Sequence, residues 1–541
     1  MTQGDDSQRA PSRRRFLKRA VGAMGGLLAA SCAPEAPAPP PAPKATTAAP
    51  PPAPAAKEAA AAAGALPDGL DVSLFHLHTQ QPLTLEAKRS SIGLGVLTPM
   101  SRFFVRNNLP MPPQSVLDDR DGWSLQVEGV KAPRALTLAQ LKQLGVETVA
   151  TVLQCSGNGR QYYTHGPSGS QWGTGAAGCA MWTGVPVRKV VEALGGVADG
   201  MSYMTSTGGD PLPDGVDPLK VIVERSIPVA KGLGDALLAW EMNGAPLPLT
   251  HGGPLRLIVP GFYGCNQIKY IKKLAFTAEQ TQAKIQRSGY RLRPIGEKGD
   301  PSQPSMWQMN LKSWVSGPGA DAQPVLTGPV LFHGVAFSGG ERAVERVEVS
   351  LDGGATWADA AWVGPDLGPW AWRNFTFAAT LAPGEHTVVS RAWDASGASQ
   401  PEQRVENERG YGNNSWRDLA LTIQVVKELP RVVKKAADAT GAADAPVGPA
   451  PGSAKLSEQG ARGRQLFTKD ASPPCASCHT LGDAGAEGVV GPNLDQLAPD
   501  HAKVTQAVTN GVGSMPPYRE TLSSDQIADI ARYIGEATGK K

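Results

Sequence analysis

The sequence has little net charge, few cysteines and, near its start, an apolar run too short to cross a bilayer. Its 541 residues include 52 Lys and Arg against 49 Asp and Glu, giving a net charge of +3. This balance argues against a nucleic acid or another polyanion as the main partner. The apolar run at residues 21–30 is about half the length that a spanning helix needs. Only six cysteines occur, so the setting of each can be considered separately.

The composition otherwise indicates a globular protein of about three to four domains. Apolar residues make up 41% and charged residues 19%, both ordinary values. The 48 prolines and 62 glycines are concentrated in linkers, which mark the domain boundaries. We expect a targeting segment at 1–32, an Ala/Pro-rich tether at 33–69, a first domain at 70–295, a second at 296–427, a linker at 428–454 and a last domain at 455–541.

The first 32 residues resemble an export signal. Ser12–Lys18 (SRRRFLK) looks like a twin-arginine signal, and residues 28–32 resemble a lipoprotein processing site with Cys32 as the lipidated residue. Ser31 before the cysteine fits that site imperfectly, so simple cleavage near Ala30 is the alternative. Twin-arginine export carries folded cargo, which implies a cofactor inserted before export. We expect a periplasmic protein, with the tether separating a lipid anchor from the domains that follow.

One cysteine, Cys155, lies where chemistry is expected. The β-rich run Glu147–Leu153 leads it into a loop punctuated by glycines, and Arg160 follows five residues later. A thiolate beside a cation has a lowered pKa, which suits nucleophilic attack or metal binding. Soft sulfur beside an anion-binding guanidinium suits a redox metal that acts on an oxyanion. The alternative is a buried structural cysteine.

Periodicity predicts two different folds in the first two domains. In 70–295, Trp123–Val127 alternates like a strand, Thr137–Gln140 is a capping box, residues 185–194 have a helical period and Leu255–Val259 reads as a buried strand. This combination predicts a mixed α+β domain. From 296 to 427, short strands and turns without a helical period predict a β-sandwich, which we expect to be immunoglobulin-like.

The last domain contains the motif C-x-x-C-H. Cys475 and Cys478 can form thioethers with haem while His479 binds the iron, and Met515 lies in a Gly- and Pro-bounded loop that could supply a sixth ligand. A redox pair or half of a zinc site are alternatives, but neither a second C-x-x-C nor a βαβ pattern is present. The region resembles a class I cytochrome c domain, which implies an all-α fold with one covalent haem c.

Several ordered segments around Cys155 resemble the sulfite oxidase family of molybdopterin enzymes, over most of residues 75–425. The segments are Phe103–Pro110, Leu153–Arg160, Met181–Pro186, Glu241–Pro248 and His251–Arg256, followed by Lys269. The resemblance implies molybdenum bound by a pterin dithiolene and by Cys155, and a second domain that forms a homodimer.

The resemblance also implies roles for individual residues. Arg106, Arg160 and Arg373 would hold the substrate anion, and Tyr290 would hydrogen-bond to it. The pterin contacts would be Phe104, Asn107, Asn108, Asp210, His251, Arg256 and Lys269. Asn108 stands where many family members have histidine, which puts a proton or electrostatic role there in doubt. Cys179 and Cys265 have no assigned role; free thiols are the default, and a disulfide between them is the alternative.

Together these features predict a periplasmic sulfite dehydrogenase that passes electrons through its own haem to an external cytochrome. A sulfane dehydrogenase acting on a protein-bound persulfide is the alternative within the same chemistry. A methionine sulfoxide reductase is disfavoured by the arginines and the fused haem. From a different class, the chain could be a tethered electron carrier with an inactive molybdenum domain, which an intact Cys155 disfavours.

Overall fold

The computed structural model describes residues 66–339, 342–429, 454–488, 491–511 and 515–540. The export signal, Cys32, tether residues 33–65 and linker residues 430–453 lie outside the described residues. In the part of the chain that the structure describes, no helix is both long and apolar enough to span a membrane.

Cys155 follows the last residue of a long hairpin strand. Strand β6 (Glu147–Gln154) pairs antiparallel with β7 (Ala177–Pro186) along its whole length, from Glu147 opposite Gly184 to Gln154 opposite Ala177. Strand β7 continues the sheet through β10 (Leu237–Met242), which also pairs with β11 (Ala245–Pro246) and β12 (Arg256–Ile258). The last four residues of β6 are buried, so the loop after it starts from a fixed point.

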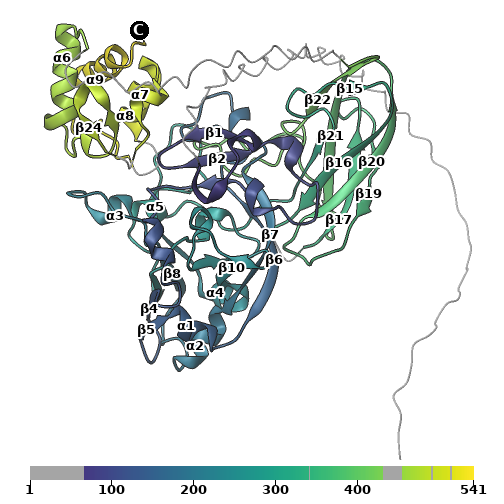
Figure 1. Cartoon of the computed structure of the whole chain (residues 1–541), viewed down its shortest axis with the longest axis horizontal. Helices are drawn as coiled ribbons and strands as arrows, with labels where there is room; N and C mark the ends of the chain where they lie inside the picture. The colour runs from purple at the N-terminus through teal and green to yellow at the C-terminus, as the bar shows by residue number, and fades with distance from the viewer. Residues whose placement is uncertain (1–65, 340–341, 430–453, 489–490, 512–514, 541) are drawn as a thin grey trace, which may run out of the picture. The chain divides into compact units, whose positions relative to one another are not determined.

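A second five-stranded sheet and short helices complete the catalytic region. The sheet order is β5 (Arg134–Thr137), β4 (Ser124–Glu128), β13 (Lys273–Thr277), β8 (Tyr203–Thr207) and β9 (Glu224–Pro228). Helices are α1 (Leu138–Lys142), α2 (Val187–Ala193), α3 (Pro218–Val221), α4 (Val229–Asp235) and α5 (Lys284–Arg287). The expected mixture of helices and strands is therefore present (Figure 1).

Local sequence signals predicted the start of helix α1 correctly and the start of helix α2 two residues too early. The Thr137–Gln140 capping box is formed, with each side chain bonded to the other residue's backbone N–H. Helix α2 begins two residues later than the helical period predicted, because Val185 and Pro186 pair with β10 as the end of β7.

A small three-stranded sheet precedes these elements and carries Arg106. Its order is β1 (Phe75–Thr79), β2 (Thr84–Ala87) and β3 (Val105–Arg106), with Thr84 opposite Arg106. The buried carboxylate of Glu86 on β2 accepts hydrogen bonds from the backbone N–H groups of Gly173 and Gly175. This sheet is thereby tied to the segment that packs beside Cys155.

Residues 312–426, called the β-domain from here on, form two sheets. One has the order β14 (Lys312–Gly317), β16 (Gly328–Phe337), β20 (Arg373–Leu381), β19 (Ala361–Val363). The other has the order β15 (Val325–Leu326), β22 (Leu421–Val426), β21 (Gly384–Asp394), β17 (Val344–Ser350), β18 (Ala358–Asp359). In Figure 1, β16 and β20 lie side by side in the first sheet.

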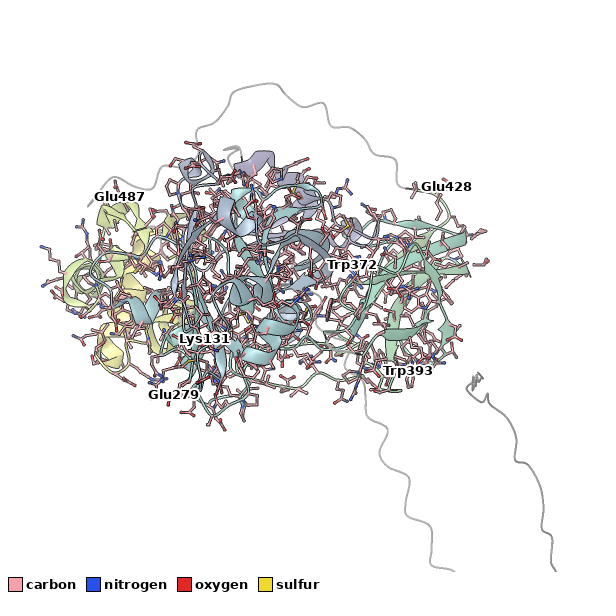
Figure 2. All side chains as sticks on the ribbon, turned by 90° about the horizontal axis from the view of Figure 1, so that it is seen from below. Lys131, Glu279, Trp372, Trp393, Glu428 and Glu487 are labelled. Carbon is pink, nitrogen blue, oxygen red and sulfur yellow. The ribbon has the colours of Figure 1, made fainter. Side chains whose placement is uncertain are left out.

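The β-domain shares a core with the catalytic region. Val105 and Val152 belong to the same buried cluster as Trp314, Phe337 and Trp372 (Trp372 is labelled in Figure 2). The indole N–H of Trp372 donates to the Val96 carbonyl at 2.8 Å. Shared burial of this kind favours a fixed arrangement, since separating the two regions would expose large apolar side chains.

The haem-motif region is helical but not all-α. Its helices are α6 (Glu458–Gln465), α7 (Leu494–Leu497), α8 (His501–Asn510) and α9 (Ser524–Ala537), the last two on capped starts. Two-residue strands β23 (Thr480–Leu481) and β24 (Ala486–Glu487) pair around a turn in which Gly485 has φ +59°. The all-α prediction missed this hairpin because such short strands leave no periodic signal.

Candidate active site

The loop from Cys155 to Arg160 holds the two residues at the centre of the site. The Cys155 N–H donates to the Ala176 carbonyl at 2.9 Å, which continues the β6–β7 hairpin by one bond. The chain then turns tightly, with Asn158 N–H bonded to the Cys155 carbonyl and Gly159 at φ +98°. That φ favours glycine, which explains the glycine before Arg160. Cys155 is 9% exposed and faces a cavity.

This inner cavity brings together all seven residues expected to hold the pterin. Its lining includes Cys155 together with Phe104, Arg106, Asn107, Asn108, Asp210, His251, Arg256, Lys269 and Tyr290. These residues come from segments up to about 190 positions apart in the sequence. The spatial grouping agrees with the sequence-based expectation, although it does not test the role of each residue.

A buried lysine and carboxylate lie at one end of the inner cavity. The Lys269 ammonium donates to Asn107 Oδ1 and, at 3.0 Å, to the Thr250 carbonyl. Burial lowers the pKa of Lys269, and the nearby Arg256 lowers it further. Burial likewise raises the pKa of the Asp210 carboxyl, which the Lys269 charge opposes. A cation and polar groups in a closed cavity suit a phosphate and a polar ring edge.

Arg256 and His251 form a second polar group in the inner cavity. Arg256 donates to the carbonyls of His251 (2.6 Å) and Gln267 (3.1 Å) and lies 4.8 Å from the Trp182 ring. Burial and the two cations beside it lower the pKa of His251 to about 3, so this imidazole is neutral. Among the described residues, buried Arg256 Nε and Gln267 Oε1 have no hydrogen-bond partner. Such orphaned polar atoms beside a cavity fit a polar ligand.

An outer cavity adjoins the inner one at Cys155 and is rich in cations. Arg106, Arg160 and Arg409 line it together with Cys155 and Tyr290. Arg160 is 5% exposed; its Nε donates to the Arg409 carbonyl and its Nη1 to the Ser170 carbonyl. In the described part of the chain none of the three arginines has a carboxylate within ion-pair distance. Cations without counter-charges, of which Arg160 is buried and the other two are half-buried, indicate a site for an anion.

Tyr290 lies between the two cavities. Its ring stacks on Tyr411 with centroids 5.4 Å apart, and the Arg225 guanidinium lies 5.5 Å from its ring centroid. The backbone holds Tyr290 at φ +48°, an uncommon conformation for a non-glycine residue. Burial raises the pKa of the Tyr290 hydroxyl, so it remains a hydrogen-bond donor at neutral pH. Its position agrees with the expected contact to a substrate anion.

The structure does not bring Arg373 together with the other residues expected to bind the substrate. Arg373 starts β20, its Nη1 donates to Asp366 Oδ2 at 2.9 Å, and its guanidinium lies 4.7 Å from the Trp362 ring centroid. It lines neither cavity. Arg373 is therefore paired with a carboxylate, whereas Arg409, which the sequence analysis did not single out, lines the outer cavity.

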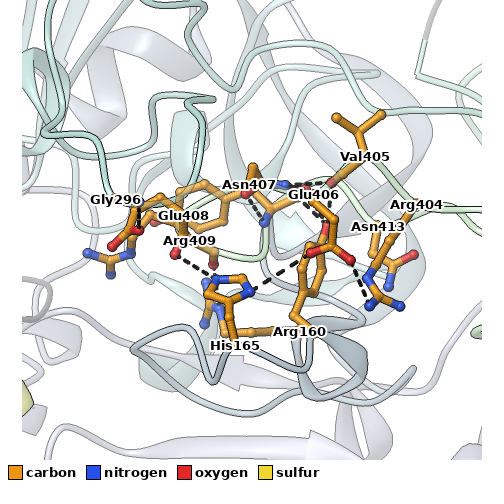
Figure 3. Close-up of polar contacts among 12 residues, drawn as sticks. Arg160, His165, Gly296, Arg404, Val405, Glu406, Asn407, Glu408, Arg409 and Asn413 are labelled. Atoms are coloured by element: carbon orange, nitrogen blue, oxygen red, sulfur yellow. Dashed lines mark hydrogen bonds and ion pairs between the residues drawn. The ribbon is translucent and has the colours of Figure 1, made fainter. Parts of the chain in front are cut away.

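Arg409 lies on a strap of the β-domain, residues 404–413, that packs against the loop carrying Arg160 (Figure 3). Glu408 accepts a hydrogen bond from the Gly296 N–H at 2.8 Å, and its N–H donates to the Arg293 carbonyl. His165 contacts the Glu408 carbonyl and the Glu406 carboxylate. These contacts hold in place the part of the strap that leads to Arg409. Its own Nε is buried and unpartnered within the described residues.

The haem motif places its residues around one buried core. Cys475 opens a single 3₁₀ turn, Cys475–Ser477, and is buried, while Cys478 is half-buried. Burial raises the pKa of Cys475 to about 12, so the thiols are neutral before attachment. His479 Nδ1 bonds to the Pro492 carbonyl at 3.0 Å, which leaves Nε2 as the nitrogen available to iron. Met515 packs against the same core.

The remaining cysteines, Cys179 and Cys265, are both free, so no disulfide joins them. Burial raises the pKa of the Cys179 thiol to about 12, as expected of an inert core cysteine. Cys265 lines the inner cavity, where the Ser156 hydroxyl donates to its sulfur at 3.3 Å.

Comparison with known families matches three consecutive parts of the chain. Residues 109–285 match the oxidoreductase molybdopterin binding domain, 303–424 the Mo-co oxidoreductase dimerisation domain, and 458–534 the cytochrome C oxidase, cbb3-type, subunit III family. Chicken (Gallus gallus) sulfite oxidase is 31% identical over 361 residues, which cover 63% of this chain and 76% of that protein. The chain belongs to the sulfite oxidase family. Its active-site region is therefore a molybdopterin site, followed by a cytochrome c domain.

Two further relatives limit what the family likeness covers. Human mitochondrial sulfite oxidase is 33% identical, over 64% of this chain and 65% of that protein. The match thus spans slightly less than two thirds of the mammalian relative. Among solved structures, the sulfane dehydrogenase SoxCD from Paracoccus pantotrophus covers 64% of this chain and 88% of that chain, with 25% identity and a TM-score of 0.54.

The residues present fit the cofactors that the family implies. Cys155 offers a soft sulfur ligand at the junction of the two cavities, and the inner cavity offers cations and orphaned polar atoms for a phosphorylated pterin. In the cytochrome c domain, two thiols and an imidazole with a free Nε2 fit a covalently bound haem c.

Proposed function

We propose that this chain is a periplasmic sulfite dehydrogenase. In the overall reaction, sulfite and water give sulfate, two protons and two electrons, and the electrons pass singly through the haem to an external cytochrome. The observation that supports this most is the set of three arginines without carboxylate partners around Cys155, among the described residues. Sulfite is a small, doubly charged anion near neutral pH, so it suits such a site.

Each side chain has a distinct part in this reaction. Arg106, Arg160 and Arg409 bind the sulfite oxygens through planar guanidinium groups, which orients the sulfur towards the metal side of the cavity. Tyr290 donates a hydrogen bond from its un-ionised hydroxyl to a substrate oxygen. The molybdenum–pterin group supplies oxygen-atom transfer and takes up two electrons when it is bound.

Measuring stoichiometry tests the proposal. Purified protein is given sulfite and ferricytochrome c, and sulfate is determined by ion chromatography. The proposal predicts one sulfate for every two molecules of cytochrome c reduced. Methionine supplied in place of sulfite should reduce little cytochrome c. Failure to form sulfate from sulfite, in protein shown to contain both molybdenum and haem, would contradict it. That result would also favour the inactive electron carrier.

The likeness to sulfane dehydrogenase SoxCD supports a second candidate, oxidation of a protein-bound persulfide. Free sulfite and a carrier protein bearing a cysteine persulfide should be compared as substrates at equal concentration. We expect turnover with sulfite, because three cations around Cys155 suit a free dianion better than a tethered sulfur atom. Turnover with the persulfide alone would establish the second candidate.

We also propose the assembly and location that the sequence suggests. The β-domain matches a dimerisation family, which supports a homodimer, and we retain an immunoglobulin-like sandwich as its fold. Sedimentation measures the mass directly. Export by the twin-arginine route and lipidation at Cys32 are tested by fractionating cells that express Arg13→Lys/Arg14→Lys or Cys32→Ala. The first variant should stay in the cytoplasm, and the second should leave the membrane fraction.

A further inference from the structure

Hydrogen bonds from the β-domain hold the loop that carries Cys155 and Arg160 in place. Three hydrogen bonds reach successive backbone carbonyls of the loop. The Gly412 N–H donates to the Ser156 carbonyl at 2.9 Å. Lys312 Nζ donates to the Asn158 carbonyl at 3.1 Å, and Asn413 Nδ2 donates to the Gly159 carbonyl at 3.0 Å. A fourth hydrogen bond runs in the other direction, because Arg160 Nε of the loop donates to the backbone carbonyl of Arg409 in the strap. A domain matched only to dimerisation therefore sets the shape of the catalytic loop.

Among the three β-domain donors Lys312 alone carries a charge, since Gly412 donates through its backbone N–H and Asn413 through its side-chain amide. Lys312 begins β14 and is 1% exposed, and within the described residues no carboxylate lies within ion-pair distance of it. Burial lowers its pKa to about 7, and Asp418 and Cys155 are the groups whose charges oppose this shift. A buried ammonium group keeps its charge at neutral pH only where a negative group offsets the cost of burial. The charge needs a compensating partner.

Asp418 is already engaged elsewhere. Both its oxygens accept from Arg404 Nη1, at 2.9 and 3.0 Å, and Oδ2 also accepts from Asn413 Nδ2. The Arg404 cation therefore neutralises most of this carboxylate's charge. Cys155 is the other group that acts on Lys312, and its sulfur is anionic when it binds a metal.

We propose that Lys312 is a positioning residue for the catalytic centre: it fixes the Asn158 carbonyl in the Cys155–Arg160 loop and sets a buried ammonium group against the loop that carries the metal-binding sulfur. This inference rests on the proposed role of Cys155 as the molybdenum ligand. A positive charge near that sulfur favours the site after it has accepted two electrons, because the added negative charge is partly offset.

The test replaces Lys312 by methionine, which keeps the length of the side chain and removes its charge and hydrogen bond. Lys231→Met is the matched control, since Lys231 is partly buried but is paired with Asp235 and, within the described residues, makes no hydrogen bond to the loop. In each holoenzyme, molybdenum content is measured first. The molybdenum midpoint potential is then determined by redox titration monitored by electron paramagnetic resonance, with the haem potential of the same sample as an internal reference.

We expect the K312M holoenzyme to retain molybdenum and haem, with its reduced molybdenum state disfavoured about tenfold, equivalent to about −30 mV for a two-electron couple. The haem potential should not move. With sulfite, kcat should fall about tenfold while KM changes less than about twofold, because the substrate arginines remain. Lys312→Arg should restore most of the potential, since it restores the charge.

Asn413→Ala separates charge from geometry, because it removes a neighbouring hydrogen bond to the same loop without changing charge. It should lower kcat and leave the molybdenum potential unchanged. An unchanged potential in K312M, or an equal shift in N413A, would overturn the proposal. Failure of both Lys312 variants to accumulate as folded protein would also overturn it, because the role would then be in folding. Since the potential is measured without sulfite, these outcomes do not depend on whether sulfite is the substrate.

Discussion

The two redox sites of this chain are built in opposite ways. The haem site takes both thiols and its first iron ligand from five consecutive residues, Cys475–His479, within one small domain. The molybdenum site takes Arg106, Cys155 and Tyr290 from the catalytic region and Arg409 from the β-domain, some 300 positions after the first. A site of the first kind can be recognised in a sequence by its spacing. A site of the second kind depends on how distant segments pack.

The largest effect should follow removal of the metal-binding sulfur. Replacing Cys155 by serine is expected to reduce sulfite turnover by at least about a thousandfold, because a hard hydroxyl replaces a soft thiolate. The haem spectrum and thermal midpoint of the cytochrome c domain should be unchanged, since that site is built independently. Steady-state assays with sulfite and absorbance spectra of the same sample measure both. A wild-type rate in this variant would show that Cys155 is not the ligand.

Removing the haem ligand His479 should disable the haem site and leave the molybdenum site working. His479→Ala should abolish sulfite-dependent reduction of the external cytochrome, because Nε2 is the nitrogen available to iron. Turnover with ferricyanide, an acceptor that can take electrons directly from the molybdenum site, should stay within about twofold of wild type because distant sites behave additively. An equal loss with both acceptors would mean that the two sites are not independent.

Paired arginine variants sharpen the assignment within the molybdenum site. Arg409→Met should lower kcat/KM for sulfite by about 100-fold, as expected when a charge-assisted hydrogen bond of about 2 to 3 kcal/mol is lost. Arg373→Met should change it less than about twofold, because Arg373 is paired with Asp366 away from both cavities. Arg409→Lys tests whether the planar fork matters as well as the charge. The reverse ranking would restore the original prediction.

The smallest effect concerns the contact between the catalytic region and the β-domain at His76 and Asp321, whose Nε2 and Oδ1 atoms are 3.8 Å apart. Hydrogen bonding to Asp321 raises the pKa of His76 above 6.5. A raised folded-state pKa stabilises the protein fully below the unfolded value, and this stabilisation is lost as pH rises through the folded value. Relative to His76→Gln, wild type should therefore lose stability between pH 5.5 and 8.

That loss should be only a few tenths of a kcal/mol, because the His76 side chain is 51% exposed and solvent screens the pair. Urea unfolding of both proteins at the two pH values, followed by tryptophan fluorescence, measures it. Parallel pH profiles for wild type and the variant would show that the pair contributes nothing to the contact between these regions.

These two sites also show what the sequence could and could not predict. The pterin segments around Asn107, His251 and Lys269 were found because each has its own local motif, and the fold brings all three to one cavity. The position of Arg373 away from both cavities could not be predicted, because its motif indicates a strand start but not the Asp366 carboxylate that pairs with it. Arg409 was missed since it lies in a loop of the β-domain. The glycines after it, Gly410 and Gly412 at φ +59° and +70°, resemble the pattern around Arg160 and could have drawn attention to it.

The hydrogen bonds from the β-domain to the Cys155–Arg160 loop could not be predicted from the sequence either, because they also depend on how distant segments pack. The hydrogen bond between Lys312 and the Asn158 carbonyl joins positions 154 residues apart, and Lys312 belongs to none of the segments that the sequence analysis singled out. Long-range packing, rather than any local preference, decides such contacts.

The most direct test of the account is stopped-flow absorbance of the purified chain mixed anaerobically with sulfite and no other acceptor. The account predicts that the haem becomes reduced in each molecule that contains molybdenum, and that the Cys155→Ser variant shows no such reduction. Haem that stays oxidised in molybdenum-loaded wild-type protein, although dithionite reduces it, would contradict the account.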